Sequence, residues 1–228
     1  MNLYKYDTHV HTKEGSACAS VTGKEQVKIY KKLGYSGIII TDHFFNGNSN
    51  VPRKLHWKER VDGLAQGYES ALVEGKKLGL SVFFGWEETY YGRDFLIYGL
   101  DKHWLYEHPE KLSWDIKTLY QETKKAGGFM VHAHPYRSLE AINGDLPMCP
   151  EYIDGVEVLN ASNKRTESNQ MASRYAEEMK KFVTAGSDAH HKVTPRSGLI
   201  SETPIKNIQE FIEQLTQGKL EIIMPEKK

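Results

Sequence analysis

The feature of this sequence that most restricts its fold is an alternation of short apolar runs with longer stretches that have the periodicity of amphipathic helices. The apolar runs predict strands over residues 4–10, 37–41, 81–86, 95–100, 129–132, 155–159 and 182–185. Strands that alternate with helices are typical of a parallel sheet, and about seven such units in one domain favour a closed barrel. The usual barrel has eight units in roughly 250 residues, so we expect a small or distorted α/β barrel. An open, doubly wound sheet is the alternative.

Signals for helix ends support this division of the chain. The predicted helices span residues 24–33, 58–78, 113–126 and 168–181, and a glycine directly follows each of the first three. Glycine just past the last periodic residue commonly ends a helix. Thr203 and Pro204 predict the start of a further helix that ends at Gly218, before a last strand over residues 221–224.

Composition restricts the class of protein. The chain has 228 residues, of which 39% are hydrophobic, and this fits a single domain over residues 1–228. Its formal net charge is zero, which gives no overall attraction to nucleic acid or to anionic membranes. No apolar run approaches the roughly 18 to 20 residues that span a bilayer, and two cysteines make no disulfide framework. We therefore expect a cytoplasmic protein that has no membrane partner.

The segment YDTHVHT places two histidines one residue apart at the end of the first predicted strand. Side chains two positions apart point to the same face of a strand, so His9 and His11 converge, with Asp7 on the same face. This geometry suits a metal ion. The alternative is the exposed polar face of an edge strand, and the heptad alone does not decide between them.

Metal-binding residue types also follow the other predicted strands. Beyond His9 and His11, these residues are Asp42, His43, Glu87, Glu88, His132, His134, Asp188, His190 and His191, and Arg137 follows the fifth strand as well. In a parallel barrel the carboxyl ends of the strands lie on one face, where catalytic sites are built. Each motif alone is weak evidence, but five of them at strand ends predict one shared pocket.

Some of these residue types have simpler interpretations. We expect His56, His103 and His108 at the surface or in packing contacts, because they lie in polar or aromatic loops. Asp42 is interpreted as a carboxylate that orients a ligand, and Cys18 as a small packing residue.

The donor set predicts both the metals and the chemistry. Imidazoles and carboxylates without thiolates suit Zn²⁺, Mn²⁺ or Fe²⁺ better than Ca²⁺ or Mg²⁺. Eight or nine candidate ligands are too many for one tetrahedral ion, so we expect two or three divalent metal ions bridged by a carboxylate such as Glu87. Clustered metals generate a hydroxide near neutral pH and clamp an oxyanion, which is chemistry for phosphoester hydrolysis.

The order HVH, TDH, a glutamate after the third strand, AHP and SDAH resembles the PHP family, the polymerase and histidinol phosphatase domains, from about Tyr6 to His190. This resemblance implies a distorted (β/α)7 TIM-like barrel with a trinuclear metal site. It also implies the ligands. The first metal would take His9, His11, Glu87 and Asp188, the second Glu87 and His134, and the third His43 and His190.

Two positions depart from the family pattern. Where the third metal usually takes a ligand, this chain has Ala17, and the nearby Glu14 is proposed as the substitute. Asp94 takes the place of a ligand before the fourth strand. If either substitution fails, the site holds two metals.

The resemblance and the donor set together predict a metal-dependent phosphatase. A metal-bridging hydroxide would attack a phosphate monoester in line at the centre that contains Asp188 and His190. Arg137 and Arg196 would bind phosphate oxygens, as the arginine fork is suited to do. The simpler interpretations are that Arg137 pairs with Glu140 and that Arg196 is an ordinary loop residue. Either His190 or a metal-bound water would protonate the leaving group.

Three classes of function follow. The first is hydrolysis of a small phosphorylated metabolite, with histidinol phosphate or a nucleotide monophosphate as the leading substrates. The second is a phosphoesterase that acts on nucleic acid ends, which is less favoured because the chain has no basic stretch interleaved with aromatic residues. The third is a domain that binds metals without turnover. The substrate and the oligomeric state are left open.

Overall fold

Nine strands form one mixed sheet in the part of the chain that this computed structural model describes, residues 3–145, 148–194 and 196–224. The strand order is β7-β6-β5-β4-β3-β2-β1-β8-β9. The strands are β1 (Tyr4–Val10), β2 (Gly37–Ile40), β3 (Ser81–Tyr90), β4 (Arg93–Tyr98), β5 (Phe129–Ala133), β6 (Gly155–Asn160), β7 (Phe182–Gly186), β8 (Gly198–Ser201) and β9 (Glu221–Ile223). This is a distorted α/β barrel, as predicted.

The barrel is nearly closed where β7 meets β1. The Thr8 hydroxyl donates to the carbonyl of Ala185 at 2.9 Å, and the backbones of His11 and Ala189 are joined by a hydrogen bond of 3.1 Å. The N–H of Ala189 in turn donates to the carbonyl of His9 at 3.2 Å. The ends of β1 and β7, which are far apart in sequence, are therefore held side by side.

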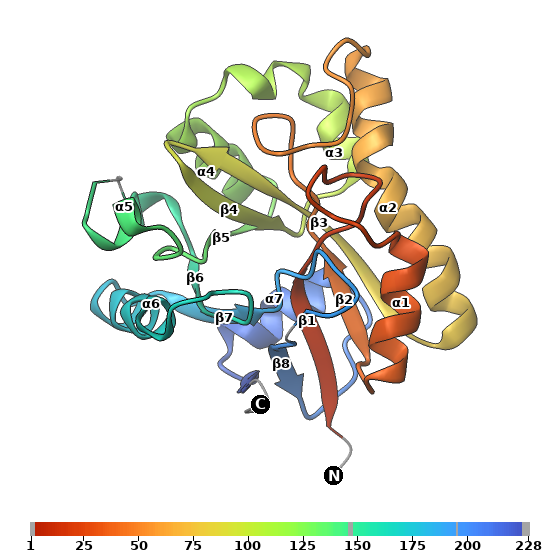
Figure 1. The fold of residues 1–228 in the computed structure, drawn as a ribbon. Helices are drawn as coiled ribbons and strands as arrows, with labels where there is room; N and C mark the ends of the chain where they lie inside the picture. Colours follow the sequence, from red (N-terminus) through yellow and green to blue (C-terminus); the bar gives the residue numbers. More distant parts are fainter. Residues whose placement is uncertain (1–2, 146–147, 195, 225–228) are drawn as a thin grey trace.

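Helices cover the outside of the sheet (Figure 1). They are α1 (Gly23–Lys32), α2 (Trp57–Leu78), α3 (Lys102–Glu107), α4 (Ile116–Lys125), α5 (Leu139–Ile142), α6 (Thr166–Glu178) and α7 (Ile208–Thr216), with 3-10 turns at η1 (Pro109–Ser113) and η2 (Pro150–Tyr152). Helices α1 and α2 lie together on one flank, and α6 lies on the opposite flank. None of the described helices is long and apolar enough to cross a membrane.

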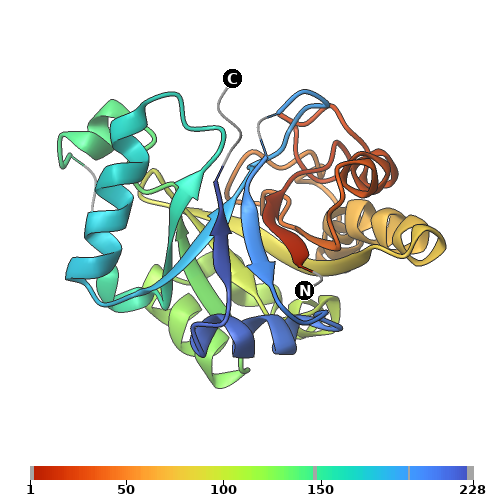
Figure 2. The same ribbon diagram turned by 90° about the horizontal axis from the view of Figure 1, so that it is seen from below.

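Helix α7 covers the end of the barrel at which the parallel strands begin (Figure 2). Its Phe211 and Leu215 belong to the same buried cluster as Tyr6 and Phe129, and the Phe211 ring contacts that of Tyr98. Because this end is filled with apolar side chains, the carboxyl ends of the parallel strands form the open face.

The sheet is mixed where the sequence predicted parallel strands. Strand β4 runs antiparallel to both β3 and β5, because the chain reverses direction at Tyr91 and Gly92. These two residues have φ values of 54° and 73°, the left-handed pair that a two-residue hairpin turn requires. Strand β8, which the sequence did not predict, pairs antiparallel with β1 and β9.

Two helix starts also differ from the prediction. The last helix begins after Asn207, whose side chain accepts a hydrogen bond from the N–H of Glu210, and not at Thr203. The helix predicted from residue 113 starts after Asp115, which caps it through the N–H of Thr118. In both cases a side chain that satisfies an unpaired N–H fixes the helix start.

Candidate metal centre

The carboxyl ends of the strands bring together the histidines and carboxylates that the sequence singled out. Four overlapping groups have ligand atoms within 4.8 Å of one another: His9, His11 and Asp188; Glu87, Asp94 and His134; His11, His43 and His190; and His9, His134 and Glu157. Eight of the nine predicted metal ligands belong to these groups, although strands β1, β3, β4 and β7 and the segments after β2 and β5 are distant in sequence.

The first group lies at the end of β1. Nε2 of His9 and Nε2 of His11 are 3.0 Å apart, so the alternation along β1 does direct both rings to one point. The Asp188 Oδ1 lies 3.5 Å from Nε2 of His9 and 3.3 Å from Nε2 of His11. Glu87 approaches the same two nitrogen atoms at 3.5 and 3.3 Å. These four side chains could hold one ion.

Glu87 lies between this group and the other two. Its Oε1 is 3.1 Å from Nε2 of His134, and its Oε2 is 2.9 Å from Nδ1 of His43. Asp94 completes the group around His134, and its Oδ1 accepts a hydrogen bond from the Thr89 hydroxyl at 2.7 Å. Glu87 is thus placed to bridge ions, the role that the sequence predicted for it.

The third group is a cluster of imidazoles. The His11 ring lies 4.1 Å from that of His190 and 4.5 Å from that of His43, measured between ring centroids. Since imidazole is the commonest metal ligand, three converging rings beside a carboxylate could hold a further ion.

Buried atoms without hydrogen-bond partners show that divalent cations fit this site. Within the described residues, Oε2 of Glu87, Oδ1 of Asp188 and Nδ1 of His43 are buried, and their close contacts with neighbouring rings and carboxylates lack the geometry of a good hydrogen bond. Glu87 and Asp188 are only 1% and 2% exposed. Burying carboxylates is costly unless cations compensate them, and the mixed nitrogen and oxygen donors suit Zn²⁺, Mn²⁺ or Fe²⁺. The residues therefore support a multinuclear metal centre whose ions are not identified by the structure.

The pKa shifts of the site's histidines and carboxylates also show that this site favours positive charge. Burial would lower the pKa of His43, but the Glu87 carboxylate outweighs it and raises that pKa to about 11. His190 is likewise opposed by burial, yet its contact with Asp188 raises its pKa to about 10. Burial acts to raise the pKa of Asp188, while His9 and Arg137 bring it well below its usual value. Protons on the histidines supply the positive charge that divalent cations would supply.

Two buried carboxylates hold the ligands in orientation. Glu157 Oε1 lies 3.0 Å from Nδ1 of His9, while Oε2 accepts from the N–H of His134 at 2.9 Å. Asp42 acts through Ser16, whose hydroxyl lies 2.7 Å from Asp42 and 3.0 Å from Nδ1 of His11. Glu157 is not among the ligands predicted from the sequence, although an acidic residue inside the apolar strand GVEVLN is a signal for a role in the site.

The backbone at the site departs from ordinary geometry. His134 and Asp188 have φ values of 28° and 53°, in the left-handed region that non-glycine residues rarely adopt. Such strain is found at functional sites, where surrounding contacts enforce it. Gly186 allows the close approach of β7 to β1, because a Cβ at this position would lie 2.5 Å from the Cβ of His9.

The structure does not bring every predicted residue into the site. Glu14 belongs to none of the groups within the described residues; its carboxylate accepts from the N–H of Gly23, at 3.2 and 3.3 Å, at the start of α1. Arg196 lies over the Tyr30 ring, 4.9 Å from its centroid, and does not line the cavity beside the metal centre. Glu14 instead interacts with the N-terminus of α1, which favours a negative charge, and Arg196 interacts with an aromatic ring.

Arg137 is placed at the site, as predicted, but its partners differ from the Glu140 of the simpler interpretation. Its guanidinium contacts Asp188 and donates to Oδ1 of Asn160 at 3.1 Å. His132, which also follows the predicted fifth strand, lies inside β5 and packs on Phe95 with its ring centroid 4.8 Å away. It is therefore a core residue and not a ligand.

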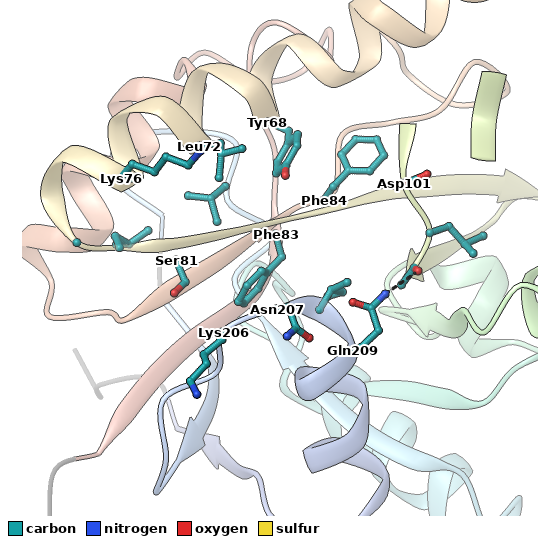
Figure 3. A pocket seen from close by; sticks show the side chains of 17 residues that line it. Tyr68, Leu72, Lys76, Ser81, Phe83, Phe84, Asp101, Lys206, Asn207 and Gln209 are labelled. Atoms are coloured by element: carbon teal, nitrogen blue, oxygen red, sulfur yellow. Dashed lines mark hydrogen bonds between the residues drawn. The ribbon is translucent and has the colours of Figure 1, made fainter. Parts of the chain in front are cut away.

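A cavity of about 610 Å³ opens beside the metal centre. Asp188, His190 and Arg137 line its inner wall, and Lys164 and Arg165 contribute further positive charge. A second cavity, of about 600 Å³, lies at the opposite end of the barrel between α2, the start of β3 and the loop before α7 (Figure 3). It includes none of the clustered ligands, so the first cavity is the candidate substrate site.

The fold and these ligand groups define a barrel protein with a buried multinuclear metal site. A family model described as PHP-associated matches residues 166–193, which include Asp188 and His190. No curated protein sequence matches the chain.

Solved structures share the fold. A two-domain protein from Bacteroides vulgatus that contains a predicted PHP-like metal-dependent phosphoesterase superposes with a TM-score of 0.69 and 17% identity, over 98% of this chain and 65% of that one. A proposed metal-dependent phosphoesterase from Bifidobacterium adolescentis has a TM-score of 0.58 and 18% identity, and the match covers 94% of this chain and 96% of that one. The lesion-specific endonuclease from Pyrococcus furiosus has a TM-score of 0.60 and 14% identity, and the match covers 98% of this chain and 58% of that one. The chain thus spans just under two thirds of the first of these proteins. The chain therefore has the fold of these PHP-like structures, and its segment over residues 166–193 matches a PHP-associated model, in keeping with the resemblance that the sequence predicted.

Proposed function

We propose that this protein is a metal-dependent phosphoesterase that hydrolyses the phosphate monoester of a small metabolite. The observation that carries the proposal is the position of Glu87, a buried carboxylate whose two oxygens face the rings of four histidines at 2.9 to 3.5 Å. A carboxylate between ligand groups is the arrangement of sites that hold two or more ions. Divalent cations bound here would supply a nucleophile from water near neutral pH and neutralise charge on the phosphoryl oxygens.

The chain's own residues would position the substrate. Arg137 borders the cavity next to Asp188, and its planar fork suits two oxygens of one phosphate. Lys164 and Arg165 line the same cavity and would attract an anionic substrate locally, although the chain has no net charge. His190 faces both the cavity and Asp188, so it can carry a proton close to the leaving group. These placements support a small anionic substrate.

Hydrolysis of p-nitrophenyl phosphate by purified protein, with bound metal determined on the same sample, tests the proposal. We expect hydrolysis that requires metal and that is lost in His9→Ala. Exposed His103, which lies outside the ligand groups, provides the control His103→Ala, which should keep both metal and activity. Bound metal without hydrolysis would favour a domain that binds metals without turnover.

A phosphoesterase acting on nucleic acid is the second candidate. The similarity in fold to an endonuclease and the basic residues of the cavity favour it, while the zero net charge does not. Rates on p-nitrophenyl phosphate, bis-p-nitrophenyl phosphate and a short oligonucleotide would separate the two candidates. A monoesterase should prefer the first compound, whereas a nuclease should prefer the diesters.

A further inference from the structure

The side-chain amide of Asn160, at the end of β6, connects the substrate cavity with the metal centre. Asn160 is fully buried. Its Oδ1 accepts a hydrogen bond from Nη2 of Arg137 at 3.1 Å, and its Nδ2 donates to Oε2 of Glu157 at 2.9 Å. Arg137 borders the cavity, whereas Glu157 orients the His9 ring. One amide therefore contacts a candidate phosphate-binding group on one side and a support of the metal centre on the other.

The partners of this amide fix its orientation. Oδ1 also accepts from the N–H of Ser162 at 3.0 Å, so both of its partners are donors. Nδ2 faces two carboxylates, since it lies 2.9 Å from Glu157 and 3.4 Å from Asp188. A flipped amide would place donors against the Arg137 guanidinium and an acceptor against the carboxylates. The Asn160 side chain therefore has one favourable orientation, as expected of a group that positions others.

Helix α6 holds the backbone of Asn160 as well. The side-chain amide of Asn169, near the start of α6, accepts from the N–H of Asn160 at 3.1 Å and donates to its carbonyl at 3.3 Å. The Asn169 Oδ1 also accepts from Nδ2 of Asn163 at 2.7 Å. Because one side chain binds both backbone groups of Asn160, the end of β6 is fixed relative to α6.

The contact with Asn160 restricts a long side chain that is otherwise free to move. The Arg137 side chain is 39% exposed, and fixing such a side chain costs conformational entropy unless contacts already hold it. Asn160 and Asp188 both bind its Nη2, while Nε and Nη1 make no hydrogen bond within the described residues. These two nitrogen atoms are left to donate to the oxygens of a phosphate.

We propose that Asn160 is a positioning residue that holds the Arg137 guanidinium and the Glu157 carboxylate in register, so that phosphate is bound next to the metal ions. The inference rests on the proposed function. Asn160 takes part in no chemical step and acts only through its two partners. Loss of its amide should therefore weaken phosphate binding through Arg137 and metal binding through Glu157.

Substitution Asn160→Ala tests both effects. Calorimetric titration of the metal-free protein with Zn²⁺ should show an affinity lowered by about 10-fold, as for other groups that support metal ligands. Titration of the metal-loaded protein with inorganic phosphate should show Kd raised by roughly 10-fold, because a hydrogen bond to a charged group is lost. KM for p-nitrophenyl phosphate should rise with it. Asn169→Ala should change the same quantities in the same direction by a smaller factor.

Two comparisons separate positioning from a general structural role. Asn207→Ala removes the cap of α7 at the opposite end of the barrel, so it should lower the melting temperature and leave both affinities unchanged. In the Arg137→Gln background, Asn160→Ala should add little to Kd for phosphate or to KM, since the partner through which it acts is absent.

The outcomes also separate this inference from the proposed function. Additive effects of Asn160→Ala and Arg137→Gln on phosphate binding would overturn it, and so would an Asn160→Ala protein that only melts earlier, as Asn207→Ala does. If Asn160→Ala does not fold, unchanged Zn²⁺ and phosphate affinities in Asn169→Ala would overturn it instead. A wild type that binds metal and phosphate but hydrolyses no ester would contradict the proposed function alone. A wild type that binds no metal would contradict both.

Discussion

Glu157 Oε1 lies 3.0 Å from Nδ1 of His9, and both side chains are fully buried. Because Nδ1 is engaged by the carboxylate, Nε2 of His9 is left to face His11, Glu87 and Asp188. Contacts of this kind fix the orientation of a metal-binding histidine and make it a stronger ligand. Glu157 therefore orients the His9 ring within the candidate metal centre.

Substitution Glu157→Gln should weaken metal binding while the fold is retained. Loss of such supporting carboxylates typically costs about 10-fold to 100-fold in metal affinity. Calorimetric titration of the metal-free protein measures the change. Glu178→Gln, on the exposed part of α6, is the control and should bind metal as the wild type does. Equal affinities in both variants would show that Glu157 has no role at the centre.

Arg137→Gln should raise KM for a phosphate ester more than it lowers kcat. A hydrogen bond to a charged group contributes about 1.5–3 kcal/mol, so kcat/KM should fall by roughly 10-fold to 150-fold. Arg196→Gln provides a matched control, because Arg196 lies over Tyr30 and outside the cavity. A larger effect from Arg196→Gln than from Arg137→Gln would restore the original prediction for Arg196. Bound metal is measured in both variants.

The metal-free protein should lose stability as pH rises through the alkaline range. His43 has a pKa of about 11 in the folded protein, against about 6.5 for histidine in an unfolded chain. The folded state therefore binds more protons between these values. The resulting stabilisation is fully present below about pH 6.5 and is lost as pH approaches the folded pKa.

Melting temperatures measured in chelator from pH 6.5 to 10 check this expectation. The wild type should lose more stability over this range than His43→Gln, which lacks the titrating ring. A wild-type melting temperature that rises with pH relative to the variant would contradict it. Metal-loaded protein should not show the difference, since bound cations replace the proton.

A buried ion pair between Lys111 and Glu88 should make the fold sensitive to the loss of one of its two partners. Lys111 is fully buried, contacts Oε1 of Glu88 and lies 3.7 Å from the Phe44 ring centroid. Removing one partner leaves a buried charge without compensation, so Lys111→Met should cost about 3–5 kcal/mol. Denaturation in urea measures the loss, and the double variant Lys111→Met with Glu88→Gln should recover most of it. Lys125→Met, at an exposed ion pair with Glu122, should change stability by at most about 1 kcal/mol.

The sequence predicted the positions of the candidate ligands best where local periodicity decides the direction of a side chain. Strand β1 has the predicted bounds, and alternation along it correctly placed His9 and His11 together. The strand ends after β2, β5 and β7 likewise placed His43, His134 and Asp188 at one face. Periodicity and strand order are enough to predict the positions of these residues, because the carboxyl ends of parallel strands lie on one face of a barrel.

Other features of the site and the fold depend on contacts between residues distant in sequence, which local sequence patterns do not predict. Glu157 lies within a fully buried strand, and its role follows from the distant His9. Glu14 was a reasonable candidate by position, yet the free N–H of Gly23 at the start of α1 competes for its carboxylate. The antiparallel course of β4 depends on a two-residue turn at Tyr91 and Gly92, which lies between the strands predicted over residues 81–86 and 95–100.

The most direct test of the metal centre and its chemistry is a parallel titration of metal-free protein with Zn²⁺ and with Mn²⁺. Bound metal per chain and release of phosphate from a monoester would be measured on the same samples. We predict that hydrolysis appears as the chain takes up two or three ions, and that both binding and hydrolysis are lost in His9→Ala. Hydrolysis that is indifferent to chelator and to His9→Ala, or a chain that takes up no metal, would contradict the account.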